Sequence, residues 1–142
     1  MLTSARNQFS GTIKEINIGA VNAEVLINLK GGETIIASIT KDSVENLGLK
    51  SGLDVIALVK APQIILVTDF GGYKLSARNQ LAGEITLVKS GAVNAEVDIQ
   101  LKGGDLVAAT VTNDSVENLG LKKGQAVTAV FKAGAVILAV AG

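Results

Sequence analysis

Apolar and polar residues alternate along most of the chain, in short segments separated by turn-forming residues. The clearest segment runs from Ala20 to Leu29, where every odd-numbered position from Val21 onward is apolar. Alternate side chains of a β-strand share one face, so this pattern predicts a strand with one buried face. Further strands are expected in the first half at Phe9–Ile18, Thr34–Thr40, Asp54–Lys60 and Ile64–Thr68.

Two departures from simple alternation carry information. The Phe9–Ile18 segment has one slip in its period, which is typical of a β-bulge. In Val55–Val59 both faces are apolar, which indicates a strand covered on two sides by another domain or another chain. Lys30-Gly31-Gly32-Glu33 separates two strands and predicts a hairpin loop, because glycine tolerates the backbone angles of tight turns.

The period changes after the third strand. Thr40 to Gly48 predicts a short helix, with Thr40 as its N-cap and Gly48 as its terminator. Five short strands with one helix between the third and the fourth follow the order of an oligonucleotide/oligosaccharide-binding barrel. The sequence therefore predicts an all-β fold built on barrels of this type.

The whole pattern occurs twice. Ser4-Ala5-Arg6-Asn7-Gln8 returns 72 positions later as Ser76-Ala77-Arg78-Asn79-Gln80, and without a gap 37 of the 67 aligned positions from residue 4 onward are identical. This duplication predicts two tandem five-stranded barrels, residues 1–69 and 76–142, joined by a short linker at 70–75. The second copy should form strands near Leu81–Val88, Ala92–Leu101, Leu106–Thr112, Ala126–Lys132 and Ala135–Val140, with a helix at Asn113–Leu119.

Composition removes several classes of function. The formal net charge is zero and only 3% of the residues are aromatic, which argues against a nucleic-acid binder that needs a basic field and stacking rings. The chain has no Cys and no His, so a zinc, copper or iron site is not expected. We see no secretory signal and no apolar run long enough for a membrane helix, so we expect a cytoplasmic protein without membrane contact.

Enzymatic chemistry has little support in the sequence. No Ser-His or Cys-His pair is possible without His and Cys. No glycine-rich phosphate-binding motif follows a predicted strand. Glu24 and Glu96 are equivalent positions of the two copies rather than a spaced acid/base pair. We therefore expect no catalytic residues.

The remaining polar candidates are suited to an anion. Arg6 offers a planar fork for oxygen anions, and Ser4 lies on the same side of an extended segment. Thr40 and Ser43 stand at a helix start, where free N–H groups favour negative charge. Lys60 ends a hydrophobic strand. Such a set would fit a small tetrahedral dianion, and all five residue types recur in the second copy.

Each of these groups also has a purely structural interpretation. The Ser-Ala-Arg-Asn segment could be a solvated lead-in to the first strand. Thr40 and Ser43 are often simply helix caps, and Lys60 could extend its ammonium group to solvent at a sheet edge. Residue types alone leave both interpretations open.

Five segments of the first copy together point to one family: Ser-Ala-Arg-Asn, Gly-Ala-Val-Asn-Ala-Glu-Val, the strand end at Ile39-Thr40, Leu-Gly-Leu after the helix, and Val59-Lys60-Ala61-Pro62. The first, second and fourth segments recur unchanged in the second copy. In this combination they resemble a molbindin, or Mop, domain, and the chain resembles a di-Mop member. The resemblance implies a barrel of the predicted type, assembly of duplicated chains into homotrimers, and molybdate or tungstate as ligand, without a further cofactor.

The resemblance also implies two types of site. In the first type, the oxyanion lies between domains, held by residues that correspond to Ser4, Ala5, Arg6, Thr40, Ser43 and Lys60, and to Ser76, Ala77, Arg78, Thr112, Ser115 and Lys132. A second type lies on the threefold axis, with Ala20, Val21, Asn22, Ala92, Val93 and Asn94 as candidates. Pro62 is replaced by Gly134 in the second copy, so a looser backbone beside Lys132 could make the two first-type sites unequal.

The expected function is therefore storage or homeostasis of molybdate by a trimeric binding protein. Two other classes remain as alternatives. One is a nucleic-acid-binding barrel, which the few aromatic residues and the neutral charge disfavour. The other is a structural assembly module, in which the polar set serves only as caps and interface hydrogen bonds. A regulatory role would need a separate partner.

Overall fold

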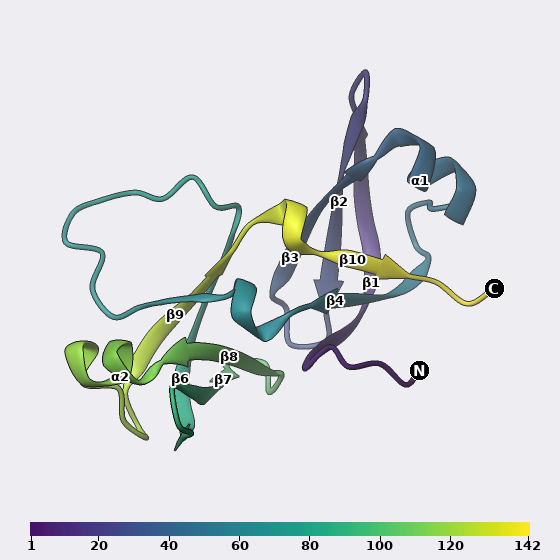
Figure 1. Ribbon diagram of the computed structural model, residues 1–142. Coiled ribbons are helices and arrows are strands. Elements are labelled where there is room, and N and C mark those ends of the chain that lie inside the picture. Colours follow the sequence, from purple (N-terminus) through teal and green to yellow (C-terminus); the bar gives the residue numbers. More distant parts are fainter.

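Two five-stranded antiparallel sheets, each curled into a barrel, lie side by side in the computed structural model, which describes residues 1–142 (Figure 1). The first repeat contributes β1 (Asn7–Ile18), β2 (Asn22–Leu29), β3 (Thr34–Thr40), α1 (Lys41–Leu47), β4 (Asp54–Val59), the 3₁₀ helix η1 (Ala61–Gln63) and β5 (Ile65–Val67). The second contributes β6 (Asn79–Ser90), β7 (Asn94–Leu101), β8 (Leu106–Thr112), α2 (Asn113–Leu119), β9 (Ala126–Phe131), η2 (Ala133–Ala135) and β10 (Ile137–Ala139). The predicted all-β class with two tandem barrels is confirmed.

The fifth strands are exchanged between the two barrels. The strand order is β10-β4-β1-β2-β3 in one sheet and β5-β9-β6-β7-β8 in the other. Thus β10 pairs with β4, through Ile137 opposite Leu58, and β5 pairs with β9, through Ile65 opposite Val130. Each barrel is completed by a strand from the other repeat, so neither repeat folds as a closed unit by itself.

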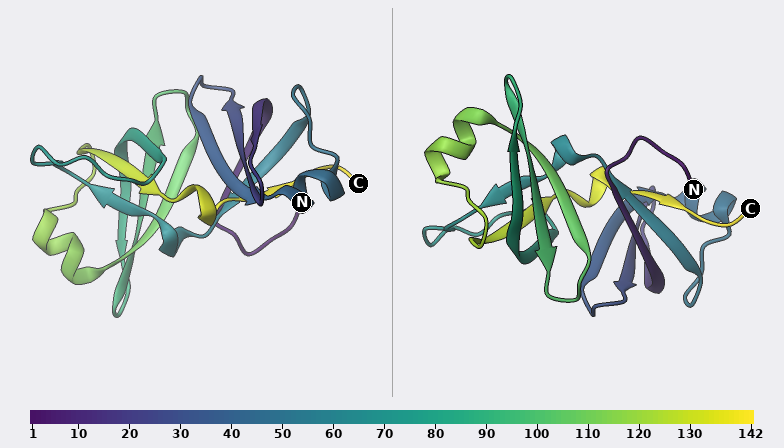
Figure 2. Two further views of the ribbon diagram at one scale, coloured as in Figure 1. Left: turned by 90° about the horizontal axis from the view of Figure 1, so that it is seen from above. Right: turned by 90° about the horizontal axis from the view of Figure 1, so that it is seen from below.

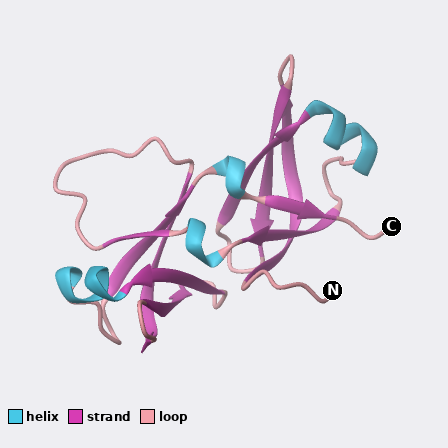
Figure 3. Cartoon of the chain, in the orientation of Figure 1, coloured by secondary structure: helices cyan, strands magenta, loops and turns pink.

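The chain crosses between the barrels at the two 3₁₀ helices, which lie at the centre of the molecule (Figure 3). Residues 68–78, which include the expected linker, instead connect β5 to β6 within the second sheet. In Figure 1 this segment is the long loop on the far side of the second barrel. The sequence repeats therefore do not coincide with the barrels, because each barrel contains four strands of one repeat and the fifth strand of the other.

Local sequence signals account for most element ends. The Thr40 side chain accepts a hydrogen bond from the Ser43 N–H at the start of α1, and Gly48 adopts the left-handed conformation, φ 64°, at its end. Both predicted caps are confirmed, and α2 repeats them. The predicted bulge lies in β1, where the register with β2 shifts between Ile13 and Glu15.

The start of the first predicted strand needs correction. β1 starts at Asn7 rather than Phe9, because Asn7 already pairs with Val59 of β4. Between the fourth and fifth strands of the first repeat, Ala61–Gln63 forms a 3₁₀ turn, for which proline at the start of the helix is well suited. This turn directs the chain into the other barrel.

A single aliphatic core runs through both barrels. Its 28 buried residues come from both repeats, and Phe9 and Phe131 are the largest fully buried side chains. In β4, both Leu58 and Val59 are buried, as the doubly apolar pattern predicted. The two views of Figure 2 show the barrels in close contact from opposite sides.

Two asparagine side chains join the barrels. Asn7, 1% exposed, bonds to both backbone groups of Ala108 in β8: its Nδ2 donates at 2.8 Å and its Oδ1 accepts at 2.7 Å. Asn79, 0% exposed, does the same with Ile36 in β3, at 2.8 Å in both directions. Each side-chain amide thus replaces one peptide unit of a neighbouring strand and satisfies buried backbone groups.

The hairpin loops of the two barrels also meet. A Cβ atom built on Gly31 would lie 2.2 Å from the Cα atom of Gly103, so both positions require glycine for close backbone approach. The Gly103 N–H donates to the Glu33 carboxylate at 3.0 Å. None of the helices is long and apolar enough to cross a membrane.

Candidate functional site

A cavity of about 360 Å³ lies where the two barrels meet. The lead-in segment Ser4-Ala5-Arg6 forms one wall, and Lys60 with the start of η1 forms another. Thr110 of β8 and Ile137 of β10 close it from the second repeat. The structure therefore brings together four of the predicted first-type residues, the segment Ser4-Ala5-Arg6 and Lys60, which lies 54 positions after Arg6. It also adds Thr110, which the sequence did not indicate.

The two cationic side chains of the cavity, Arg6 and Lys60, differ in whether they form an ion pair. Arg6 Nη2 forms an ion pair with Glu96 Oε1, which comes from β7 of the other barrel. Lys60 takes part in neither of the two ion pairs in the chain, and its side chain is exposed at the cavity. A guanidinium, a free ammonium and the hydroxyls of Ser4 and Thr110 are the groups that bind oxyanions in proteins.

Strand pairing fixes Glu96 beside the cavity. Glu96 lies directly opposite Thr110 in the β7–β8 ladder. Burial alone would raise the pKa of Glu96, but hydrogen bonds from Asp98 and Arg6 and the charge of Arg6 outweigh this and lower it. Glu96 is therefore a stable anion that orients Arg6 across the barrel interface. Arg6 has five N–H donors and keeps several free for a second acceptor.

The second repeat builds an equivalent junction. Arg78 Nη1 donates to Glu24 Oε2 at 2.5 Å, again across the barrels. η2, which follows Lys132, packs against β3 as η1 packs against β8. Ser76 and Ala77 precede Arg78 as Ser4 and Ala5 precede Arg6. The predicted second set is thus arranged by the same topology.

The helix-start residues lie elsewhere. Thr40, Ser43, Thr112 and Ser115 do not line the cavity at Arg6. The Thr40 hydroxyl donates to Ser43 Oγ at 2.8 Å, and Thr112 donates to Ser115 Oγ at 2.9 Å. Within one chain Thr40 and Thr112 cap the two helices, and Ser43 and Ser115 are their hydrogen-bond partners. The two threonines are exposed and the two serines are half-buried.

The candidates for a second type of site lie at the hairpin turns between β1 and β2 and between β6 and β7. Val21 and Val93 are each 71% exposed. The Val21 carbonyl accepts from Lys41 N at 2.8 Å, and the Val93 carbonyl from Asn113 N at 2.9 Å, which ties each turn to the following helix. Ala20, Asn22, Ala92 and Asn94 are exposed beside them and do not line the cavity at Arg6.

The replacement of Pro62 by Gly134 leaves the local backbone unchanged. Both segments form a 3₁₀ helix of three residues, and Lys60 and Lys132 precede them with similar angles, φ −71° and −70°. The structure does not show the looser backbone that the substitution suggested.

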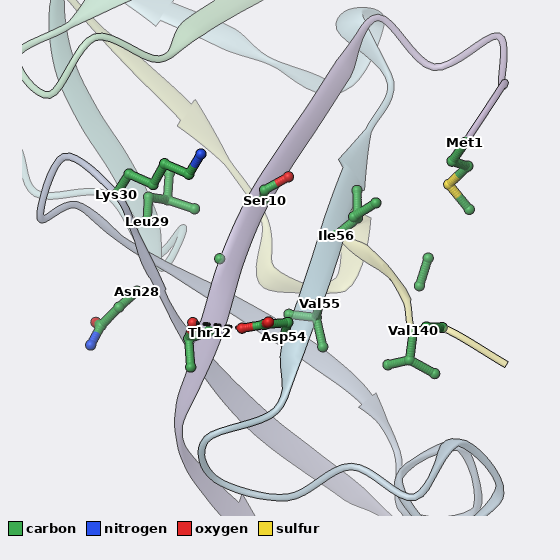
Figure 4. Close-up of a pocket in the computed structure, with 13 residues that line it drawn as sticks. Met1, Ser10, Thr12, Asn28, Leu29, Lys30, Asp54, Val55, Ile56 and Val140 are labelled. Atoms are coloured by element: carbon green, nitrogen blue, oxygen red, sulfur yellow. Dashed lines mark hydrogen bonds between the residues drawn. The ribbon is translucent and has the colours of Figure 1, made fainter.

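A second cavity, about 680 Å³, lies on the outer face of the first barrel (Figure 4). Ser10 and Thr12 of β1, Asp54 of β4 and Val140 after β10 line it, and Thr12 donates to Asp54 at 3.1 Å. It contains none of the predicted site residues, and it holds no arginine; its one lysine, Lys30, is accompanied by the Asp54 carboxylate. The smaller cavity at the barrel junction is therefore the better candidate.

Comparison with known proteins agrees with this architecture. The TOBE domain family matches residues 3–66 and 75–138, once per repeat. The chain is 46% identical over 140 residues to the molybdenum transport protein ModE of Herbaspirillum seropedicae and 48% identical over 142 residues to ModE of Azotobacter vinelandii. It is 39% identical to the molybdenum-pterin-binding protein MopA of Rhodobacter capsulatus.

The chain therefore belongs to the TOBE domain family, in the tandem form of the molbindins that its repeated motifs predicted. It spans about half the length of the curated relatives it matches, 52% of each of these three. A solved structure covers it almost completely: the cytoplasmic molybdate-binding protein ModG with molybdate bound is 49% identical, has a TM-score of 0.97, and is matched over 99% of this chain and 100% of that chain.

Proposed function

We propose that this chain binds molybdate or tungstate and serves in cytoplasmic molybdate storage and homeostasis. The observation that carries the proposal is the cavity at the barrel junction, where the segment Ser4-Ala5-Arg6 meets Lys60, which is distant in sequence. The match to ModG, whose structure holds molybdate, supports the same ligand. Storage is the finer part of the proposal, because relatives named as transcriptional regulators share the domain.

Binding requires no bond making or breaking. The tetrahedral dianion would exchange its hydration shell for charge-assisted hydrogen bonds from Arg6 and Lys60 and for hydroxyl donors such as Ser4. Glu96 keeps the guanidinium in place, so less side-chain entropy is lost when the anion arrives. The apolar side chains of Leu58 and Ile137 adjoin these polar groups in the cavity wall. The chain functions as a binding protein, not an enzyme.

We further propose that the chain assembles as a homotrimer, as the resemblance implies. The hydroxyls of Thr40, Ser43, Thr112 and Ser115 would then complete first-type sites in a neighbouring domain. The exposed hairpin turns at Val21 and Val93 would meet near the threefold axis and provide the second type of site. Sedimentation equilibrium tests this directly: the expected mass is three times 14.5 kDa, and a monomer at micromolar concentration would contradict it.

Equilibrium dialysis against molybdate in a large excess of sulfate tests the proposed ligand, with molybdenum per chain measured by mass spectrometry. More than one retained molybdate per chain is expected. Lys60→Ala should weaken retention by about tenfold or more through loss of a charged donor. Lys74→Ala, which removes an exposed lysine from the β5–β6 loop, is the matched control and should bind normally. No retention by the folded wild-type protein would refute the function.

The formal net charge of zero and the small number of aromatic residues, four, argue against nucleic-acid binding by this chain. An electrophoretic mobility shift assay at low salt should show no complex with duplex DNA, with or without molybdate. A shifted band that requires molybdate would instead favour the regulatory class to which some relatives belong.

A further inference from the structure

Strand β8 has an open outer edge beside the cavity at the barrel junction. It is the last strand of its sheet and pairs only with β7. On its other side, the Asn7 amide bonds to both the N–H and the carbonyl of Ala108, so these two groups point away from β7. In an antiparallel ladder, the backbone groups of alternate residues point to the same side. The N–H of Thr110, two residues after Ala108, therefore faces the same outer edge.

Thr110 lies where this edge meets the cavity. It lines the cavity together with the Ser4-Ala5-Arg6 segment, which directly precedes Asn7 in the chain. It also lies opposite Glu96 in the β7–β8 ladder, and Glu96 is the residue that pairs with Arg6. The strand edge at Thr110 and the Arg6 side chain therefore border the same space.

Thr110 carries two hydrogen-bond donors without a partner in the chain. Its N–H faces no neighbouring strand, and its hydroxyl forms no hydrogen bond with another residue. Asn7 satisfies this edge at Ala108 and does not extend to Thr110. Because Thr110 is half-buried, its donors need water or a ligand as their acceptor.

The surroundings of these donors suit an anion. None of the residues that line the cavity is acidic, and Arg6 and Lys60 supply two positive charges. The edge of a sheet is one of the backbone arrangements that form concave anion sites in proteins. A hydroxyl beside a free N–H gives two donors on one residue, and the strand holds their positions before the ligand arrives.

The other junction has the same strand edge. Ser38 of β3 is the equivalent of Thr110 and lies opposite Glu24, which pairs with Arg78. It follows Ile36 by two residues, and the Asn79 amide bonds to both backbone groups of Ile36. Like β8, β3 is the last strand of its sheet. A half-buried hydroxyl is thus kept at both positions although the residue type differs.

We propose that Thr110 and Ser38 are oxyanion ligands, each donating its backbone N–H and its hydroxyl to the anion at its junction. The inference rests on the proposed function and extends the set of residues that hold the anion. Arg6 and Lys60 supply the charge at the first junction, and the strand edge supplies donors at fixed positions. Loss of the hydroxyl should weaken binding at that junction by about tenfold, as expected for a hydrogen bond to a charged group.

Nuclear magnetic resonance of the deuterated, ¹⁵N-labelled full chain measures each site separately during titration with molybdate. The amide resonances of Thr110 and Ser38 should move downfield and saturate, because both N–H groups gain an anionic acceptor. The Val93 amide reports separately on the proposed second type of site. Thr110→Val keeps the side-chain shape and removes the hydroxyl, so the dissociation constant read at position 110 should rise about tenfold while that read at Ser38 stays within about twofold.

Thr110→Ser is the matched control, because it installs the residue type of the equivalent position and retains the hydroxyl. Its dissociation constant should stay within about twofold of the wild-type value. Thr110→Ala removes the hydroxyl where Thr110→Val does not fold.

The outcomes separate this inference from the proposed function. Unchanged affinity at position 110 in Thr110→Val, or molybdate binding that leaves the Thr110 and Ser38 amides unmoved, would overturn the strand-edge ligands while the protein still bound molybdate. Absence of any molybdate-dependent shift in the folded wild-type protein would overturn the proposed function as well. A local loss in Thr110→Val that Thr110→Ser does not show would establish the role of the hydroxyl.

Discussion

The asparagine clamp between the barrels gives the sharpest test of how the two halves are held together. Asn79 is fully buried, and its side chain bonds to both the N–H and the carbonyl of Ile36 at 2.8 Å. Ile36 belongs to β3, so the two hydrogen bonds connect the first strand of one repeat to the third strand of the other. Asn79→Ala removes both bonds and leaves two backbone groups of Ile36 without partners.

The expected loss follows from the number of groups left unpaired. A buried donor or acceptor without a partner costs about 1 to 3 kcal/mol. Two such groups, partly relieved by water that enters the space vacated by the side chain, correspond to a loss of about 2 to 4 kcal/mol in the free energy of unfolding. For a domain of this size such a loss is a large share of the total stability.

Urea denaturation followed by circular dichroism measures this quantity. Asn17→Ala is the matched control, because Asn17 is exposed on β1 and its side-chain amide donates one hydrogen bond, to the exposed Glu15 carboxylate at 3.3 Å. It should change the free energy of unfolding by less than about 0.5 kcal/mol. An Asn79→Ala variant as stable as this control would refute the clamp, since Ile36 would then need no protein partner.

Three further changes have defined outcomes. Thr40→Ala removes the N-cap of α1 and should lower the free energy of unfolding by about 1 kcal/mol, measured by urea denaturation, and an unchanged midpoint would show that the cap contributes nothing. Gly31→Ala places a Cβ atom against the Gly103 backbone and should destabilise the fold by about 1 to 3 kcal/mol through steric strain. Calorimetry should then show a lower melting temperature than for the wild type. An unchanged melting temperature would mean that the two hairpin loops can move apart without cost. Asp98→Asn tests the pH dependence of stability, because the pKa of Asp98 is raised in the folded state. As pH rises from the ordinary aspartate range through the raised pKa, the wild type should lose stability relative to Asp98→Asn. Below that range the stabilities of the two proteins should converge. Parallel pH profiles of stability would contradict the raised pKa.

The sequence predicted those features that depend on local patterns. Alternation located the strands, and the cap residues Thr40 and Gly48 defined the helix correctly, because strand period and helix capping are set within a few residues. The bulge in β1 was visible as a slip in the period. The repeat itself followed from the identical segments, and the family resemblance followed from their combination.

The strand exchange was not predictable from these patterns. Ile65-Leu66 and Ile137-Leu138 are identical in the two copies, so either segment satisfies either barrel by its pattern. Which partner it takes depends on the path of the preceding 3₁₀ helix, which alternation does not reveal. The exchange then determines which residues meet at the barrel junction.

The site residues that the sequence missed act over long separations. Asn7 and Ala108 are 101 positions apart, and Asn79 and Ile36 are 43 apart. The Arg–Glu pairs cross between repeats, although their identity in both copies was a signal that they have a shared role. Thr110 was overlooked in favour of Thr112, because the helix cap gave Thr112 a recognisable local context.

The most direct test of the central claim is an anomalous difference map from a crystal of this protein grown with tungstate. We expect a tungsten peak in the cavity at the barrel junction, within hydrogen-bond distance of Arg6 or Lys60, and an equivalent peak at Arg78 and Lys132. Tungsten peaks confined to other surfaces, or none in a crystal of the intact assembly, would contradict the assignment of this cavity as the oxyanion site.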